Sequence, residues 1–107
     1  MPISDERARQ IAAIRFRALG DETRLRILEV LVSGECSVSE LTASVAVGQS
    51  LMSHHLRILR EAGLVADRRR GRWVYYAIVE TALAEVKLSL YELEPLRGSA
   101  NRSRPVD

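Results

Sequence analysis

Residues 37–62 read SVSELTASVAVGQSLMSHHLRILREA, and this stretch decides the fold. Ser37 and Glu40 have the three-residue spacing of a capping box, which predicts the start of a short helix. Its expected core positions are Leu41, Ala43 and Val45. Gly48 follows a tight break and is an acceptable N-cap for a second helix over residues 49–62. The stretch therefore predicts two short helices joined by a turn.

The segment before this pair predicts two further helices. The first is expected to begin with Ser4 as its cap and to end at Gly20, and the second to begin at Asp21 and to stop at Gly34. Apolar residues recur at helical spacing in both. The expected buried stripe of the second helix is Leu25, Leu28, Leu31 and Val32.

The segment after the pair changes to an alternating pattern rich in β-branched and aromatic residues. Residues 64–68 and 72–79 predict a β-hairpin with a glycine-containing turn, and residues 80–94 predict a last helix. The expected fold class is mainly α with a small β-hairpin (α+β), in the winged helix-turn-helix arrangement. We expect one domain over residues 1–96, and a disordered tail over residues 97–107 because that tail has no apolar period.

Composition excludes several protein classes. The 107 residues are 47% hydrophobic and 28% charged, which is ordinary for a soluble globular chain. No apolar run approaches the roughly 20 residues of a membrane helix, and the charged N-terminus lacks a signal core, so we expect a cytoplasmic protein without a membrane partner. A single cysteine excludes an internal disulfide, and no Cys/His cluster has zinc spacing.

Charge is distributed unevenly along the chain. Residues 49–79 carry six arginines against two carboxylates, whereas the remaining residues carry ten basic and twelve acidic groups. A basic segment in a mildly acidic chain indicates a surface that meets phosphate. The alternative is a basic patch that is only solvated.

The predicted helix over residues 49–62 separates polar from apolar residues on a helical wheel. Glutamine, serine and arginine are side chains that read base edges or neutralise phosphate. Base contacts are expected from the early residues Gln49, Ser50, Ser53 and His54, and phosphate contacts from Arg57 and Arg60. The alternative is an ordinary solvated face, which would normally carry more Glu and Lys.

His55 falls on the apolar side of the same wheel, and we expect a partly buried, hydrogen-bonded ring. The hairpin carries a second candidate set of phosphate contacts, Arg68, Arg69, Arg70 and Arg72. These arginines would otherwise only make an exposed wing soluble. We interpret Trp73, Tyr75 and Tyr76 as core and hairpin support rather than as a base-stacking platform.

Three motifs together resemble the ArsR/SmtB family of prokaryotic transcriptional regulators. They are LGDETRLRIL at residues 19–28, SHHLRILREAGLV at residues 53–65 and GRWVYY at residues 71–76. The resemblance runs in order from about residue 8 to residue 93. It implies a homodimeric winged-helix protein whose recognition helices read a palindromic operator near a promoter, and many members are repressors released by a metal ion.

In that family the first and last helices form the dimer interface. The matching apolar residues here are Ile11, Phe16, Leu83, Val86, Leu90 and Leu93. The stripe on the last helix offers more apolar surface than one small core consumes, although the alternative is that it only completes the core.

The chain departs from the family at both of its familiar metal sites. Ser37 and Ser39 stand where the best-known site has two cysteines, and Cys36 lies one position earlier. Residues 80–94 contain no histidine, whereas the second site uses Asp and His on the last helix. Hydroxyls are poor substitutes for thiolate and imidazole, so we expect no metal site of either kind and no cofactor. Cys36 is expected to be a small, buried or semi-buried residue.

These patterns predict a sequence-specific, DNA-binding transcriptional regulator, a homodimeric repressor of a nearby operon whose operator affinity an effector changes. The effector stays open between a carboxylate metal site, a small organic ligand and a separate sensor protein. The main alternatives are a winged helix used for protein–protein contact and sequence-blind architectural DNA binding. An enzyme is disfavoured because no nucleophile–base set, phosphate loop or paired-carboxylate pocket is evident.

Overall fold

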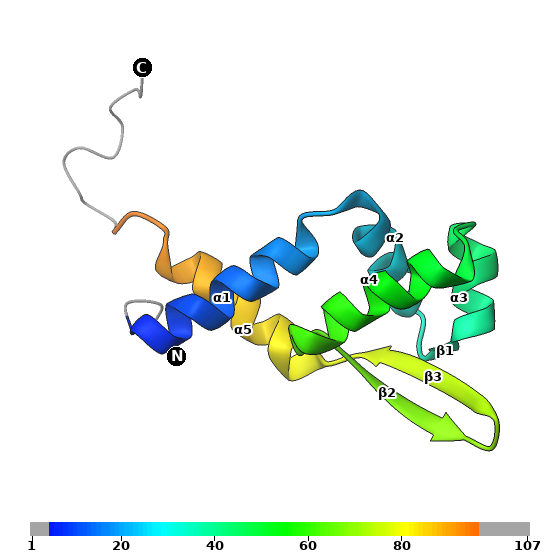
Figure 1. Ribbon diagram of the computed structural model, residues 1–107. Helices are drawn as coiled ribbons and strands as arrows, with labels where there is room; N and C mark the ends of the chain where they lie inside the picture. The colour runs from blue at the N-terminus through cyan, green and yellow to red at the C-terminus, as the bar shows by residue number, and fades with distance from the viewer. Residues whose placement is uncertain (1–4, 97–107) are drawn as a thin grey trace.

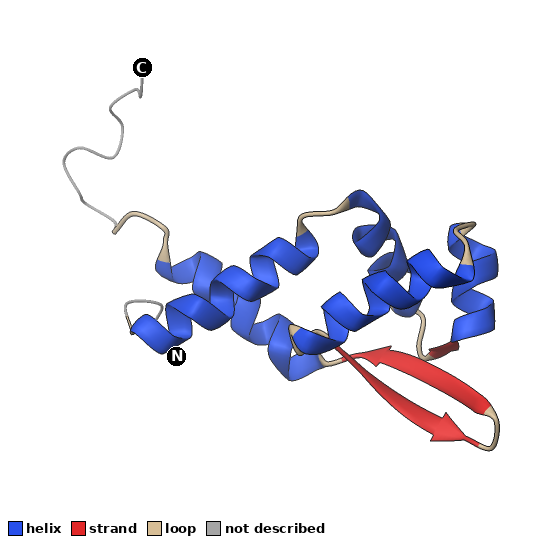
Figure 2. Ribbon diagram, viewed as in Figure 1, coloured by secondary structure: helices blue, strands red, loops and turns tan. Residues whose placement is uncertain are grey.

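The computed structural model describes residues 5–96. This part contains five helices and three strands, which confirms the expected mainly helical fold with a hairpin (Figure 1). The elements are α1 (Glu6–Leu19), α2 (Glu22–Leu31), β1 (Cys36–Ser37), α3 (Val38–Val45), α4 (Gln49–Glu61), β2 (Val65–Arg70), β3 (Trp73–Ile78) and α5 (Glu80–Glu92). Helices α1 and α5 pack together at one end, and the β2–β3 hairpin projects from the other (Figure 2).

Carboxylate caps set the starts of the first two helices. The side chain of Asp5 accepts hydrogen bonds from the first turn of α1, and the cap expected at Ser4 lies outside the described residues. Gly20 ends α1 as expected, and Asp21 caps α2 by accepting a hydrogen bond from the Arg24 N–H at 3.1 Å. The break between α1 and α2 is therefore only two residues long, so the two helices are tied closely.

The buried face of α2 differs from the expected one. Ile27 and Leu31 are buried, whereas Leu25 and Val32 are exposed. At 100° per residue, Leu25 and Val32 lie about 140–160° around the helix from Ile27, so they cannot face the same core. They line an apolar groove of about 250 Å³ with Leu83 of α5. The prediction of Leu25 and Val32 as core was wrong.

The pair of helices α3 and α4 forms as predicted. The Ser37 hydroxyl accepts from the Glu40 N–H at 3.1 Å, and the Glu40 carboxylate accepts from the Ser37 N–H at 2.8 Å, which completes the capping box. Ala46 takes the left-handed conformation (φ 60°) and Gly48 caps α4. Leu41 and Val45 are buried, but Ala43 is exposed, so its expected core position was wrong.

The hairpin belongs to a three-stranded antiparallel sheet in the order β1-β3-β2. β1 was not expected, because two residues are too short to show an alternating pattern. Gly71 in the turn has φ 62°, a conformation that glycine adopts at no steric cost. Tyr76 is buried as expected for core support, whereas Trp73 is 45% exposed and lies under the guanidinium of Arg72.

The described helices and strands share one hydrophobic core. Its largest fully buried side chains are Ile27, Leu41, Val45, Met52, Leu56, Leu59 and Leu64. Helix α5 covers this core with Ala82 and Val86. It ends at Glu92, close to the end predicted for the last helix at residue 94. The expected tail over residues 97–107 lies outside the described part. Over residues 5–96 no helix is both long enough and apolar enough to cross a membrane.

Candidate nucleic-acid interface

Helix α4 lies on the core with one face and presents the other to solvent. Met52, Leu56 and Leu59 are buried, in agreement with the expected division of the helix. The α4 residues expected to contact DNA are all exposed, and we call them the α4 polar face: Gln49, Ser50, Ser53, His54, Arg57 and Arg60. Leu51 falls on the apolar side of the helical wheel, but the residue is 46% exposed.

Five members of the α4 polar face line a groove of about 400 Å³. They are Ser50, Ser53, His54, Arg57 and Arg60, and Val38, Leu56 and Tyr76 complete the lining. The groove therefore lies where α4 meets the start of α3 and the middle of β3. The first turn of α4 contains no acidic residue and no side-chain cap, so the positive end of the helix dipole is unopposed there.

The arginines at the end of α4 are partnered within the chain. Arg60 forms an ion pair with Asp67 of β2 at 3.7 Å, and Asp67 lies opposite Tyr76 in the sheet. Burial raises the pKa of Tyr76 above its ordinary value, with a further contribution from Asp67. Arg57 lies 3.4 Å from Nδ1 of His54. The ion pair of Arg60 joins the α4 polar face to the hairpin, whereas the contact of Arg57 stays within α4.

The hairpin, residues 65–78, is called the wing from here on. Arg68 donates two hydrogen bonds to the Glu35 carboxylate, at 2.6 and 2.9 Å, and Arg70 donates another at 3.0 Å. The hydrogen bonds and charge of Arg68 hold the pKa of Glu35 below its ordinary value, with a smaller contribution from Arg70. Sequence reasoning missed Glu35, since it lies 33 residues before Arg68 and shares no motif with it.

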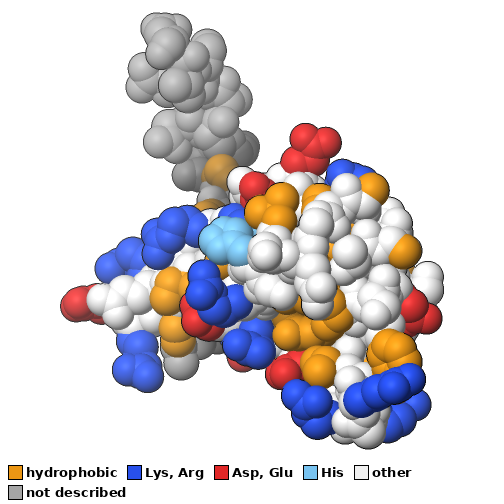
Figure 3. Space-filling view, turned by 45° about the vertical axis from the view of Figure 1, so that its right-hand side comes forward, with side chains coloured by type: hydrophobic (Ala, Val, Ile, Leu, Met, Phe, Trp, Pro, Cys, Tyr) orange, Lys and Arg blue, Asp and Glu red, His pale blue; other side chains and the backbone are white. Residues whose placement is uncertain are grey.

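The charge of the wing is therefore partly compensated. Arg68 and Arg70 share one carboxylate, and the Arg70 guanidinium also lies over the Tyr75 ring at 4.8 Å. Arg69 alternates with them and points to the opposite face of the strand. In Figure 3, Lys and Arg side chains gather at the wing tip and again beside a histidine, with a largely uncharged surface between them.

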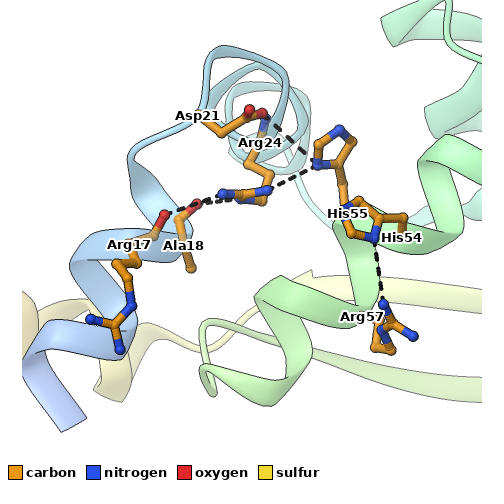
Figure 4. Close-up of polar contacts among 7 residues, drawn as sticks. All are labelled: Arg17, Ala18, Asp21, Arg24, His54, His55 and Arg57. Carbon is orange, nitrogen blue, oxygen red and sulfur yellow. Dashed lines mark hydrogen bonds and ion pairs between the residues drawn. The ribbon is translucent and has the colours of Figure 1, made fainter. Parts of the chain in front are cut away.

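His55 is buried, as expected, and its partner is Arg24 of α2. The ring is 6% exposed, and its Nδ1 lies 3.1 Å from Nη1 of Arg24 and 3.9 Å from Oδ2 of Asp21 (Figure 4). Burial lowers the pKa of His55 below its ordinary value, and the charges of Arg24 and His54 add to this, while Asp21 opposes it. Sequence reasoning placed Arg24 in a motif but did not predict this contact.

The residues that the sequence assigned to a dimer interface differ in their exposure. Leu90 and Leu93 are 53% and 62% exposed, so apolar surface remains available on α5. Ile11, Phe16 and Leu83 are half-buried, and Val86 belongs to the core of the chain itself. Exposed apolar residues that sequence reasoning did not assign to the interface are Ile14 on α1, and Leu88 and Tyr91 on α5.

Cys36 is half-buried, as expected, at the start of the sheet. Burial raises the pKa of its thiol, and the Glu40 carboxylate adds to this rise. Within residues 5–96, no three His, Cys, Asp or Glu side chains gather closely enough to hold a metal ion. The expectation that the chain has no metal site stays a prediction.

Comparison with known proteins now identifies the family. A model described as bacterial regulatory protein, arsR family, matches residues 21–67. The transcriptional repressor SdpR of Bacillus subtilis is 33% identical over 70 residues, which cover 65% of this chain and 78% of that protein. The chain belongs to the ArsR family. It is a winged helix-turn-helix transcriptional regulator, as the three sequence motifs predicted.

The chain also resembles a second bacterial regulator and a solved structure. The arsenic resistance transcriptional regulator ArsR1 of Pseudomonas putida is 47% identical over 66 residues, or 61% of this chain. The match spans only about half of that relative, 52% of its length. The homodimeric winged helix-turn-helix DNA-binding domain of Mb0332 from Mycobacterium bovis has a TM-score of 0.66 and 28% identity, covering 77% of this chain and 78% of that chain.

Proposed function

We propose that this ArsR-family chain is a homodimeric repressor that binds a palindromic operator with α4 and the wing. The observation that carries this proposal is the α4 polar face: six uncharged or basic side chains stand exposed on a helix whose other face is fixed in the core, and the exposed carboxylate of Glu61 lies only at the C-terminal end of that helix. A helix held in this way can enter the major groove without unfolding any of its support. Chromosomal DNA as partner implies that the protein works in the cytoplasm.

The exposed residues divide into two roles along α4. Gln49, Ser50, Ser53 and His54 lie in the N-terminal half, where a recognition helix reaches base edges. Arg57 and Arg60 lie one to two turns further on, and we assign them to the phosphate backbone. A glutamine pairs bidentately with adenine, whereas a serine hydroxyl is an adaptable donor and acceptor. The early residues therefore select sequence, and the later ones set register.

The wing supplies phosphate contacts outside the major groove. Arg69 and Arg72 are exposed and have no carboxylate partner among the described contacts, so their charge is available to DNA. The Glu35 carboxylate partly neutralises the charge of Arg68 and Arg70, so we assign these two arginines weaker phosphate contacts. Minor-groove or backbone contacts of this kind add affinity for all sequences.

The homodimer is proposed on the apolar residues of α1 and α5. Leu90 and Leu93 extend the strip that begins at Leu83, beside the groove between α2 and α5. A two-fold axis at this end places two copies of α4 on one face of the DNA, and successive major grooves are about 34 Å apart. The named homodimer Mb0332 shows that a neighbour of this fold assembles as two copies. We place the domain in residues 1–96.

Release from DNA is proposed to be positional. An effector that changes the distance or tilt between two copies of α4 weakens operator binding without touching the DNA-contacting side chains. A separate sensor protein that binds the dimer would have the same result.

The test begins with selection of duplexes from a random-sequence pool by the purified full chain. We expect a palindromic consensus, preferred over a scrambled duplex of equal composition, with an affinity that falls steeply as salt rises. Sedimentation gives the oligomeric state in the same buffer. No enrichment would favour the protein–protein module, and enrichment without a consensus would favour architectural binding; either result overturns the proposal.

A further inference from the structure

A single guanidinium joins three helices beneath the α4 polar face. Arg24, in the first turn of α2, donates from Nε to the Ala18 carbonyl at 2.6 Å and from Nη2 to the Arg17 carbonyl at 3.2 Å. Its third nitrogen, Nη1, lies 3.1 Å from His55 of α4. Two carbonyls at the end of α1 are thus tied to the middle of the recognition helix through one side chain (Figure 4).

The contact with His55 specifies the state of the imidazole ring. Arginine has donors and no acceptor, so the Nδ1 that faces it must be unprotonated, and the ring proton must be on Nε2. A doubly protonated ring would point an N–H at the guanidinium and place two positive charges 3.1 Å apart. The bond between Arg24 and His55 therefore exists only with the neutral ring.

The position of the ring couples the hydrogen bond between Arg24 and His55 to the side chains that are expected to contact DNA. His54, the adjacent residue, is exposed on the α4 polar face, and the two rings make an edge contact with centroids 5.3 Å apart. At the other end of α4, Nε of Arg15 donates to the Ala62 carbonyl at 3.1 Å. Helix α1 therefore holds α4 at two points, one near its middle through Arg24 and one at its end.

We propose that His55 is a positioning residue, which acts through Arg24 to set the angle of the recognition helix against α1, and that protonation of its ring releases this setting. The inference rests on the proposed DNA-binding function, because it concerns the same helix. With the contact at Ala62 kept, loss of the bond to Arg24 lets the N-terminal half of α4 pivot while the fold persists. Operator selectivity then falls in acid.

The charges around His55 set the direction of this response. Asp21 and Arg24 face the ring from the start of α2, and His54 faces it from α4 itself. Asp21 attracts the protonated ring, but it already accepts the Arg24 N–H as the cap of α2. Protonation would therefore draw the ring away from Arg24 and toward a carboxylate that is only partly free.

The experiment compares His55→Leu, which removes the acceptor, with His55→Asn, which keeps an acceptor close to Nδ1 but does not titrate. His54→Asn makes the same chemical change on the adjacent, exposed ring and is the matched control. The readout is the ratio of affinities for the selected duplex and for a scrambled duplex, so that non-specific electrostatic effects cancel. Circular dichroism and sedimentation confirm that each variant is folded and assembled as the wild type is.

We expect the ratio of the wild type to fall about tenfold between about pH 7.5 and a pH below the lowered pKa of His55, the change that the loss of one charge-assisted hydrogen bond produces. His55→Leu should have the low ratio at both values, and His55→Asn the high ratio at both. His54→Asn should lower the ratio at both values, because we assign His54 to base contacts, but should keep the fall between them. An unchanged ratio in His55→Leu, or equal losses in Leu and Asn, would overturn the proposal, because packing of the ring would then be its whole role.

A measurement without DNA separates this inference from the proposed function. The ring nitrogens of His55 in ¹⁵N-labelled full chain should show an unprotonated Nδ1 near neutral pH, and Arg24→Gln should shift that signal. A protonated Nδ1 at that pH would overturn the link to Arg24 whatever the DNA assays show. A wild type without any operator preference, but with the expected ring signals, would instead overturn the proposed function and leave the link itself established.

Discussion

Arg68 of the wing and Glu35 of the loop before β1 form a two-point ion pair, with donor–acceptor distances of 2.6 and 2.9 Å. Arg70 shares the same carboxylate. An arginine-rich hairpin that we assign to DNA thus carries its own competing anion. A phosphate that approaches the wing must therefore compete with the Glu35 carboxylate for the guanidinium groups of these two arginines.

Glu35→Gln should therefore strengthen binding to every duplex, selected or scrambled, because Arg68 and Arg70 are released from a negative partner. The dependence of log affinity on log salt should become steeper by about one phosphate contact. Titrations at several salt concentrations measure this. Glu29→Gln removes an exposed carboxylate from α2, away from the wing, and should change neither quantity. Weaker binding by Glu35→Gln would show that the ion pair shapes the wing for DNA, and equal binding would show that Glu35 does not compete with phosphate for these arginines.

Gln49→Ala and Ser53→Ala should relax the choice of sequence. A good bidentate base contact contributes about 1–3 kcal/mol of discrimination, and a single serine contact contributes less. Affinity for scrambled DNA should be unchanged. Repeating the selection with each variant shows which consensus positions become degenerate, and Thr81→Ala, an exposed change on α5, serves as the control. A consensus that survives both changes would remove these residues from the reading role.

Arg69→Ala should weaken binding to all sequences alike and reduce the salt slope by about one, because its contact is expected at phosphate. Arg7→Ala, at the start of α1, removes an exposed arginine far from the wing and is the control. A variant that altered only the preferred sequence would place Arg69 at a base edge instead.

Leu90→Glu should convert the dimer to monomers, since a carboxylate would be buried in an apolar interface without a partner. Because Leu90 is 53% exposed within the chain, the fold itself should survive. Sedimentation and operator binding should both change. Ala43→Glu places the same charge on an exposed position of α3 and should leave the oligomeric state unaltered. Persistence of the dimer in Leu90→Glu would move the interface elsewhere.

The free energy of unfolding should decrease as pH falls below about 6.5. The pKa of His55 is lowered in the folded chain, chiefly by burial, so the unfolded chain binds the proton more readily in this range. The destabilisation that protonation of His55 causes is absent above the pKa of about 6.5 that the ring has in the unfolded chain. It is complete below the lowered pKa that the ring has in the folded chain. His55→Asn should remove this part of the acid dependence, measured by urea unfolding at several pH values, whereas His54→Asn should retain it.

The sequence predicted those features that depend on local chemistry. The capping box at Ser37, the break at Gly48 and the division of α4 into two faces follow from residues within a few positions of one another. Local patterns of this kind also predicted the hairpin and the burial of His55. They required no knowledge of which elements pack together.

The features that were missed depend on the approach of distant segments. Leu25 and Val32 are exposed because α2 turns Ile27 and Leu31 to the core, and the six apolar residues within residues 22–32 do not by themselves reveal which of them face inward. β1 exists only because β3 offers it a partner. The same holds for the contacts of Glu35 with Arg68 and of Arg24 with His55, which join residues more than 30 positions apart.

The exposed leucines of α5 have a consequence for a cell that contains few copies of this protein. If two copies bury Leu90 and Leu93 against each other, mass action links the folded population to the total amount of chain. Melting temperatures should then rise with protein concentration, and dilution should expose the apolar surface of Leu90 and Leu93 to solvent. Abundance, as well as any effector, would decide how much of the chain is competent to occupy its target.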